Sequence, residues 1–93
     1  MAPTLDELQA EKDARAELIR TFALSHLTKW RRAYSREVRD ALCQDCGLLR
    51  SEFSVQHVAV ELRAMEEQGL LESELEQGPR LLRRYYRLKG TRS

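Results

Sequence analysis

The apolar positions in the first third of the chain recur at helical spacing. The stretch TLDE has a capping-box pattern, in which Thr4 can cap a helix and Glu7 can reach back to it. Good helix formers continue to about Leu27, and large apolar residues become frequent only in the second half of this stretch: Leu18, Ile19, Phe22, Ala23, Leu27 and Trp30. The pattern predicts one long helix whose second half enters the core and whose first half projects.

Two shorter helices are predicted next. The first begins at Ser35 and ends at Gly47, where a glycine can adopt the left-handed conformation that terminates a helix. After the connector GLLRSEFS, Ser54 can cap another helix, which ends at Gly69. Its expected core face consists of Val55, Val58, Leu62 and Met65.

After Gly69 the hydrophobic period changes from helical spacing to strict alternation. Apolar and charged residues alternate in LLESELE and again in LLRRYYRLK, and Gly78 and Pro79 lie between the two stretches. This predicts a β-hairpin with Leu71, Leu75, Tyr86 and Leu88 on its inner face. In that register Glu72, Glu74 and Glu76 share the outer face with Arg83, Arg87 and Lys89. Cross-strand pairs of this kind contribute about 0.2–1 kcal/mol each and help to select the register.

The order of elements predicts the fold class. Three helices followed by a hairpin are typical of a winged helix-turn-helix, a mainly α fold with a β-hairpin. We expect residues 1–28 to form an N-terminal helix that can act as a dimerisation arm, and residues 29–93 to form the winged helix-turn-helix DNA-binding domain. A chain of 93 residues has room for a single core, so no separate catalytic or effector domain is expected.

Two motifs in the last third of the chain carry a family resemblance. The segment LRAMEEQGLLES at residues 62–73 and the segment RRYYRL at residues 83–88 are similar to motifs of the PadR family of winged-helix transcriptional regulators. YSREVRDAL resembles the family's second-helix motif. The chain departs from the family at Gln56, His57, Val58 and Ala59, where a G-T-L-Y tetrad is usual. The resemblance implies a regulator that binds duplex DNA, and we expect it to act as a repressor.

The charges are nearly balanced overall but unevenly distributed. The net charge is +1, yet residues 29–50 carry +3 and residues 79–93 carry +6. No global field therefore indicates a polyanionic partner, but two basic blocks can contact phosphates. The expected phosphate-contacting residues are Lys29, Arg31, Arg32, Arg36, Arg39 and Arg50 around the second helix, and Arg80, Arg83 and Arg84 in the wing. The alternative is a solvated basic face with intrahelical pairs such as Arg36 with Asp40.

The third helix holds the expected base-reading residues. In a helix-turn-helix the N-terminal, outward side chains of this helix meet base edges in the major groove. These are Ser54, Gln56, His57 and Val60, of which glutamine suits adenine and valine suits a thymine methyl group. The alternative is an ordinary solvated face, which Glu61 and Glu67 favour because carboxylates repel phosphates.

A homodimer is expected from the first helix. Its apolar stripe is longer than a small domain can cover, and two-fold dimers commonly read two half-sites. The residues expected at the interface are Leu5, Leu8, Leu18, Ile19 and Phe22. The alternative is a solvated N-terminal extension.

Other functions find little support in the residue patterns. Cys43 and Cys46 form a CxxC, but its position at the end of a helix disfavours thiolates. A zinc site would need two further ligands, and His26 and His57 are the only histidines in the sequence. No catalytic constellation and no run long enough to cross a bilayer occurs, so we expect a cytoplasmic protein that is not an enzyme and needs no cofactor or metal. A winged-helix adaptor that binds proteins, and more remotely a thiol or zinc sensor, remain alternatives.

Overall fold

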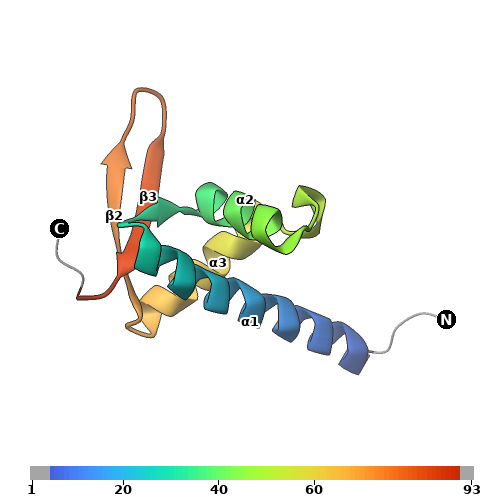
Figure 1. The fold of residues 1–93 in the computed structure, drawn as a ribbon. Helices are drawn as coiled ribbons and strands as arrows, with labels where there is room; N and C mark the ends of the chain where they lie inside the picture. Colours follow the sequence, from blue (N-terminus) through green and yellow to red (C-terminus); the bar gives the residue numbers. More distant parts are fainter. Residues whose placement is uncertain (1–4, 91–93) are drawn as a thin grey trace.

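Three helices surround the core and a hairpin extends away from it (Figure 1). The computed structural model describes residues 5–90, so Thr4 and its predicted cap lie outside the described residues. The elements are α1 (Leu5–Lys29), β1 (Ala33–Tyr34), α2 (Ser35–Cys46), the 3-10 turn η1 (Arg50–Glu52), α3 (Val55–Glu67), β2 (Leu71–Gln77) and β3 (Leu82–Leu88). The winged helix-turn-helix expected from the residue pattern is confirmed.

The sheet has one strand more than the hairpin that the sequence predicts. Its order is β1-β3-β2, with both pairs antiparallel. Strand β1 pairs Ala33 with Tyr86 and Tyr34 with Tyr85. A strand of two residues is too short to show an alternating period, which is why the pattern did not reveal it.

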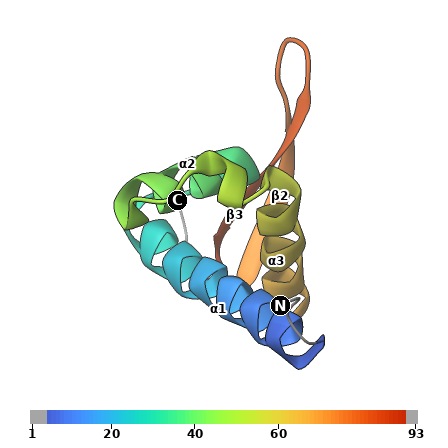
Figure 2. The same cartoon turned by 90° about the vertical axis from the view of Figure 1, so that its right-hand side faces the viewer.

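The core lies between the three helices, which form the sides of a triangle in Figure 2. Helix α1 contributes Ile19, Ala23 and Leu27, which recur every fourth residue along one stripe. The expectation that Trp30 enters the core is wrong, because Trp30 follows the last residue of α1 and is 61% exposed. The remaining buried residues are Ala33, Val38, Leu42, Cys43, Phe53, Val58, Leu62, Met65, Leu71 and Tyr86.

The hairpin forms the wing, and its strands run past the helices (Figure 1). Leu71 and Tyr86 are buried at its base, where the inner face packs on the helices. Leu75 was expected on the same covered face, but it is 57% exposed. Leu82, which pairs with Gln77 at the end of β2, is 65% exposed. The inner face is therefore covered at the base of the wing and bare toward its tip.

The end of α2 is closed by a glycine in the left-handed conformation. Gly47 has φ 66°, and the N–H of Leu48 donates to the carbonyl of Cys43 at 2.8 Å. The buried Cys43 thiol donates to the carbonyl of Leu49 at 3.6 Å, whereas Cys46 is exposed. No group of three or more metal-ligating side chains occurs within residues 5–90, and no helix in that range is long and apolar enough to cross a membrane.

The wing glutamates pair with arginines from two directions. Register places Glu72 opposite Arg87 and Glu76 opposite Arg83, so the predicted shared face is correct. The Arg87–Glu72 ion pair forms at 3.2 Å, but Glu76 pairs with Arg32 instead of Arg83. Arg32 is the residue before β1. Its guanidinium lies over the ring of Tyr85 and pairs with Glu74 and Glu76. Strand β1, which the sequence did not predict, thus places the Arg32 guanidinium where it competes with Arg83 for Glu76.

These contacts lead to a pH prediction for the wing. Hydrogen bonds from the Gly90 N–H and from Arg87 lower the pKa of Glu72, and the Arg32 hydrogen bond lowers the pKa of Glu76, below the ordinary value of 4.5. A lowered carboxyl pKa stabilises the fold above the ordinary pKa, and this contribution is lost as pH falls through the folded-state pKa. We expect urea unfolding midpoints to decline below about pH 4.5, and Glu72→Gln with Glu76→Gln to make that decline shallower.

The matched control is Glu67→Gln, which removes an exposed carboxylate on α3. An acid-induced decline that is equally steep in the double wing variant and in this control would contradict the assignment.

Candidate nucleic-acid interface

The first turn of α3 is oriented by its cap and by its buried face. The hydroxyl of Ser54 accepts from the His57 N–H at 3.0 Å, which satisfies an amide at the helix start. Because Val58, Leu62 and Met65 are fully buried, the rotation of α3 is determined. Gln56 and Val60 then face solvent, with His57 half-buried beside them. The residues expected to read bases thus share an exposed end of α3, and the Ser54 hydroxyl also serves the cap.

The start of α2 lies against the wing through aromatic and guanidinium groups. The N–H of Tyr34 donates to the Glu37 carboxylate at 3.2 Å, which closes the first turn of α2. The rings of Tyr34 and Tyr85 meet edge to face at 5.5 Å, and the Arg83 guanidinium lies 4.7 Å from the centre of the Tyr34 ring. A hydrogen bond to Tyr85 raises the pKa of Arg83 above its ordinary value. Arg83 is held beside the start of α2.

A hollow of about 420 Å³ separates the wing from the starts of α2 and α3. It is lined by Tyr34, Ser35, Arg36, Val55, Leu81, Leu82, Arg83 and Arg84. A second hollow of about 330 Å³ at the wing tip is lined by Gly78, Pro79, Arg80, Leu81 and Arg83. Neither lining contains a carboxylate, so both hollows are basic and partly apolar.

The chain is similar to two groups of transcriptional regulators. Residues 5–88 match the family model described as tetracyclin repressor-like, C-terminal domain. The chain belongs to this family. Its structure is also similar to that of a PadR family transcriptional regulator from Eggerthella lenta DSM 2243, at 25% sequence identity and a TM-score of 0.58. That alignment covers 94% of this chain and 76% of the other. No curated protein matches the chain.

The family match corrects the assignment made from the two motifs. Residues 62–73 and 83–88 indicated the PadR family, but the family model that matches is the tetracyclin repressor-like one. The motif residues form the end of α3, its junction with β2, and β3, which are elements of the fold. They therefore indicated the architecture, which is shared with the PadR-family structure, rather than the family. Both comparisons are with transcriptional regulators, in agreement with the expectation that the chain is not an enzyme.

In the structure of this tetracyclin repressor-like domain, only some of the predicted phosphate-contacting residues line the two hollows. Arg36 joins Arg83 and Arg84 at the larger hollow, and Arg80 joins Arg83 at the wing tip. Arg84 also donates to the Ser73 hydroxyl at 2.9 Å, which in turn donates to Glu66. Arg36 of α2 and Arg83 of the wing, 47 positions apart in the sequence, thus meet at one surface.

The other predicted phosphate-contacting residues have different surroundings. Arg32 is held by the wing glutamates, and a hydrogen bond to Glu76 raises its pKa. Arg39 is only 12% exposed and pairs with Asp40 at 2.7 Å, in place of the suggested Arg36–Asp40 pair. Arg50 is exposed and shares Asp40 at 3.7 Å. Lys29 and Arg31 are exposed at the end of α1, where Lys29 lines a groove beside α2.

Sequence reasoning missed three residues of this surface. Tyr34 supplies the ring under Arg83, and Leu81 and Leu82 provide apolar lining for the hollow. Tyr34 was overlooked because the pattern breaks there.

The residues expected at a dimer interface also differ in their burial. Ile19 is fully buried inside the domain, Leu18 is exposed, and Phe22 is half-buried against the core. Leu5 and Leu8 belong to α1, but the placement of their side chains lies outside the description.

Proposed function

We propose that the chain binds duplex DNA in a sequence-specific manner and represses transcription in the cytoplasm by occupying an operator. The observation that carries this proposal is the surface where Arg36, Arg83 and Arg84 line one hollow beside the exposed start of α3. The family match and the PadR-family neighbour support a regulator, because both are transcriptional regulator families.

Each part of this surface has a proposed role. Arg36 and the wing residues Arg80, Arg83 and Arg84 contact phosphates, which position the domain on the duplex. The stacking of Arg83 on Tyr34 limits the conformations of its guanidinium, so less entropy is lost when it binds a phosphate. Gln56, His57 and Val60 read base edges in the major groove from the start of α3. Arg31 and Arg50, which are exposed, are proposed to contact flanking phosphates.

The domain is also proposed to act as a homodimer through α1. Leu18 and Leu24 are exposed large apolar residues on this helix, and Phe22 lies between them in sequence. Because Ile19 is used in the core of the domain, we leave it out of the proposed interface. A two-fold dimer would select DNA sites with two inverted half-sites.

Binding to duplex DNA is expected to depend strongly on salt and to weaken when Arg36 is replaced by alanine. Each lost phosphate contact should lower the slope of log K against log salt by about 1, for all sequences alike. The measurement is fluorescence anisotropy of a labelled duplex across a salt series. Lys12→Ala, which removes one exposed positive charge from the first half of α1, is the control.

Selection from random duplexes completes this test. Enrichment of one inverted-repeat sequence supports a sequence-specific dimer. The proposal fails if duplex binding shows no salt dependence, or if Lys12→Ala and Arg36→Ala have equal effects.

A second candidate function is a protein-binding module, which the exposed apolar side chains of the wing favour. Leu75, Leu81 and Leu82 are each more than half exposed. Large exposed apolar patches mark interaction sites. Selection that enriches no DNA sequence, together with unchanged duplex binding by Arg36→Ala, would favour this alternative.

A further inference from the structure

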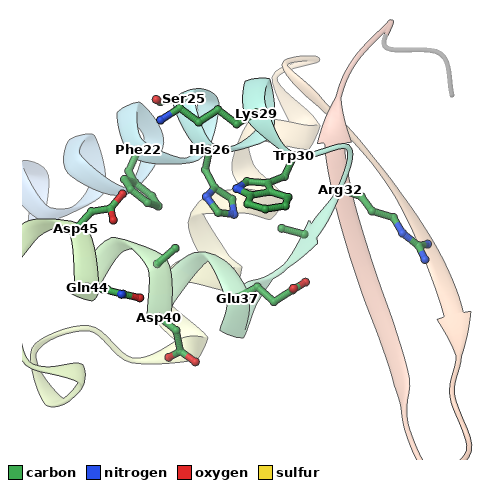
Figure 3. A pocket seen from close by; sticks show the side chains of 12 residues that line it. Phe22, Ser25, His26, Lys29, Trp30, Arg32, Glu37, Asp40, Gln44 and Asp45 are labelled. Carbon is green, nitrogen blue, oxygen red and sulfur yellow. The ribbon is translucent and has the colours of Figure 1, made fainter.

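A groove on another side of the domain is not used by the proposed DNA interface. It lies between the second half of α1 and α2, has a volume of about 530 Å³, and appears in close-up in Figure 3. Gln56, Val60 and the hollow-lining arginines of the wing are absent from its lining. The groove is therefore separate from the residues proposed to contact DNA at the hollow.

One wall of the groove is a row of aromatic rings. Phe22, His26 and Trp30 occur every fourth residue, so their side chains follow one side of the helix and the turn after it. The Phe22 and His26 rings stack with centroids 5.5 Å apart, and the His26 and Trp30 rings are tilted at 6.2 Å. All three lie on the α1 side of the groove in Figure 3. The wall is thus a nearly continuous aromatic surface.

The opposite wall carries carboxylates from α2. Glu37, Asp40 and Asp45 line the groove from that helix (Figure 3). Asp40 is neutralised by Arg39 and Arg50. Glu37 and Asp45 form no ion pair within the described residues, although one oxygen of Glu37 accepts the Tyr34 N–H.

The cationic residues of the lining offset this charge only in part. Arg32 is directed toward the wing in Figure 3 and is held there by Glu74 and Glu76. Burial lowers the pKa of His26, against the opposing influence of Glu37 and Asp45, so the imidazole is neutral at pH 7. Lys29 is the remaining cation of the groove lining. The carboxylates of Glu37 and Asp45 and the ammonium of Lys29 therefore give the groove a net negative charge beside its aromatic wall.

We propose that this groove binds a small organic cation with an aromatic ring, such as an aryl ammonium compound. Aromatic faces, Trp best of all, attract cations through the ring quadrupole and recognise quaternary ammonium ions. A neighbouring carboxylate adds a Coulomb attraction. An aromatic ligand ring stacks on Trp30 and His26, while its charged nitrogen lies toward Glu37 at the same end of the groove.

The chain contains one tryptophan, so Trp30 reports directly on the groove. The experiment is a titration of the full chain with phenyltrimethylammonium, followed by Trp30 fluorescence, with benzenesulfonate and benzyl alcohol as anionic and neutral comparisons. We expect a saturable change with the cation and a much weaker one with either comparison compound.

Charge-removing variants identify the carboxylates. Glu37→Gln removes the charge nearest the ligand nitrogen but keeps a side-chain oxygen for the Tyr34 N–H, and Asp45→Asn removes the charge at the other end of the groove. Glu37→Gln is expected to weaken binding about fivefold, as suits an ion pair of about 1 kcal/mol in water. Asp45→Asn is expected to weaken binding less, because Asp45 lies about two helical turns from Glu37. Glu67→Gln, on α3, is the control and should bind like the parent chain.

Three results would overturn the proposal. One is the absence of a saturable signal from Trp30, confirmed by calorimetry. Another is a loss of charge specificity, seen as equal binding of benzenesulfonate or as equal behaviour of Glu37→Gln and Glu67→Gln in variants whose urea unfolding midpoints match the parent. The third is a Trp30 signal that changes with protein concentration and that the cation does not reverse, which would assign the groove to a second copy of the chain. Duplex binding is measured in parallel, so failure here is distinct from failure of the proposed DNA function.

Discussion

Replacing Leu62 with alanine is expected to lower the free energy of unfolding by about 2–5 kcal/mol. Leu62 is 0% exposed on α3, where it belongs to the core between the three helices. The substitution removes buried apolar volume and leaves a cavity that the surrounding side chains fill only partly. Since small domains have only about 5–15 kcal/mol of stability in total, the variant should unfold at a much lower urea concentration.

Leu82→Ala is the matched control for this prediction. It makes the same chemical change at a side chain that is 65% exposed on the wing, and it should alter the free energy of unfolding by no more than about 0.5 kcal/mol. Equal losses in the two variants would contradict the placement of α3 and of the wing tip.

Replacing Gln56 with alanine is expected to lower discrimination between the selected DNA sequence and an unrelated duplex by about 1–3 kcal/mol. Gln56 is exposed in the first turn of α3, next to the Ser54 cap, and its amide can pair with the two edge groups of an adenine. Competition binding at one salt concentration measures the ratio of the two affinities.

Arg36→Ala provides the contrast for this second prediction. It should weaken binding to both duplexes by the same factor and leave their ratio unchanged, because a phosphate contact carries no sequence information directly. The proposed roles are wrong if Gln56→Ala weakens both duplexes equally, or if Arg36→Ala changes the ratio.

Much of the fold could be predicted from local patterns. The start of α2 at Ser35, its end before Gly47, and the cap of α3 at Ser54 all agree with the signals in the sequence. Alternation of apolar and charged residues correctly predicted that Glu72 and Arg87 share a face. These features depend on neighbouring residues or on a single turn of chain, which a linear pattern records.

The candidate site was only partly predictable. The basic residues were all visible in the sequence, but Arg36 and Arg84 line the hollow whereas Arg32 is held by wing glutamates. That difference depends on strand β1, whose two residues show no period of their own. Exposure of Leu75 depends on how far the wing extends beyond the helices, and alternation does not encode this distance.

The sequence by itself determined the order of the helices, their ends and the register parity of the wing. These follow from residue spacing, capping side chains and glycine conformation, all of which act over a few positions. Only the tertiary structure decided which arginines line the interface and where the aromatic groove lies beside α2. Arg32 meets Glu74 and Glu76 across 42 and 44 positions of sequence, and such pairings depend on the packing of distant segments.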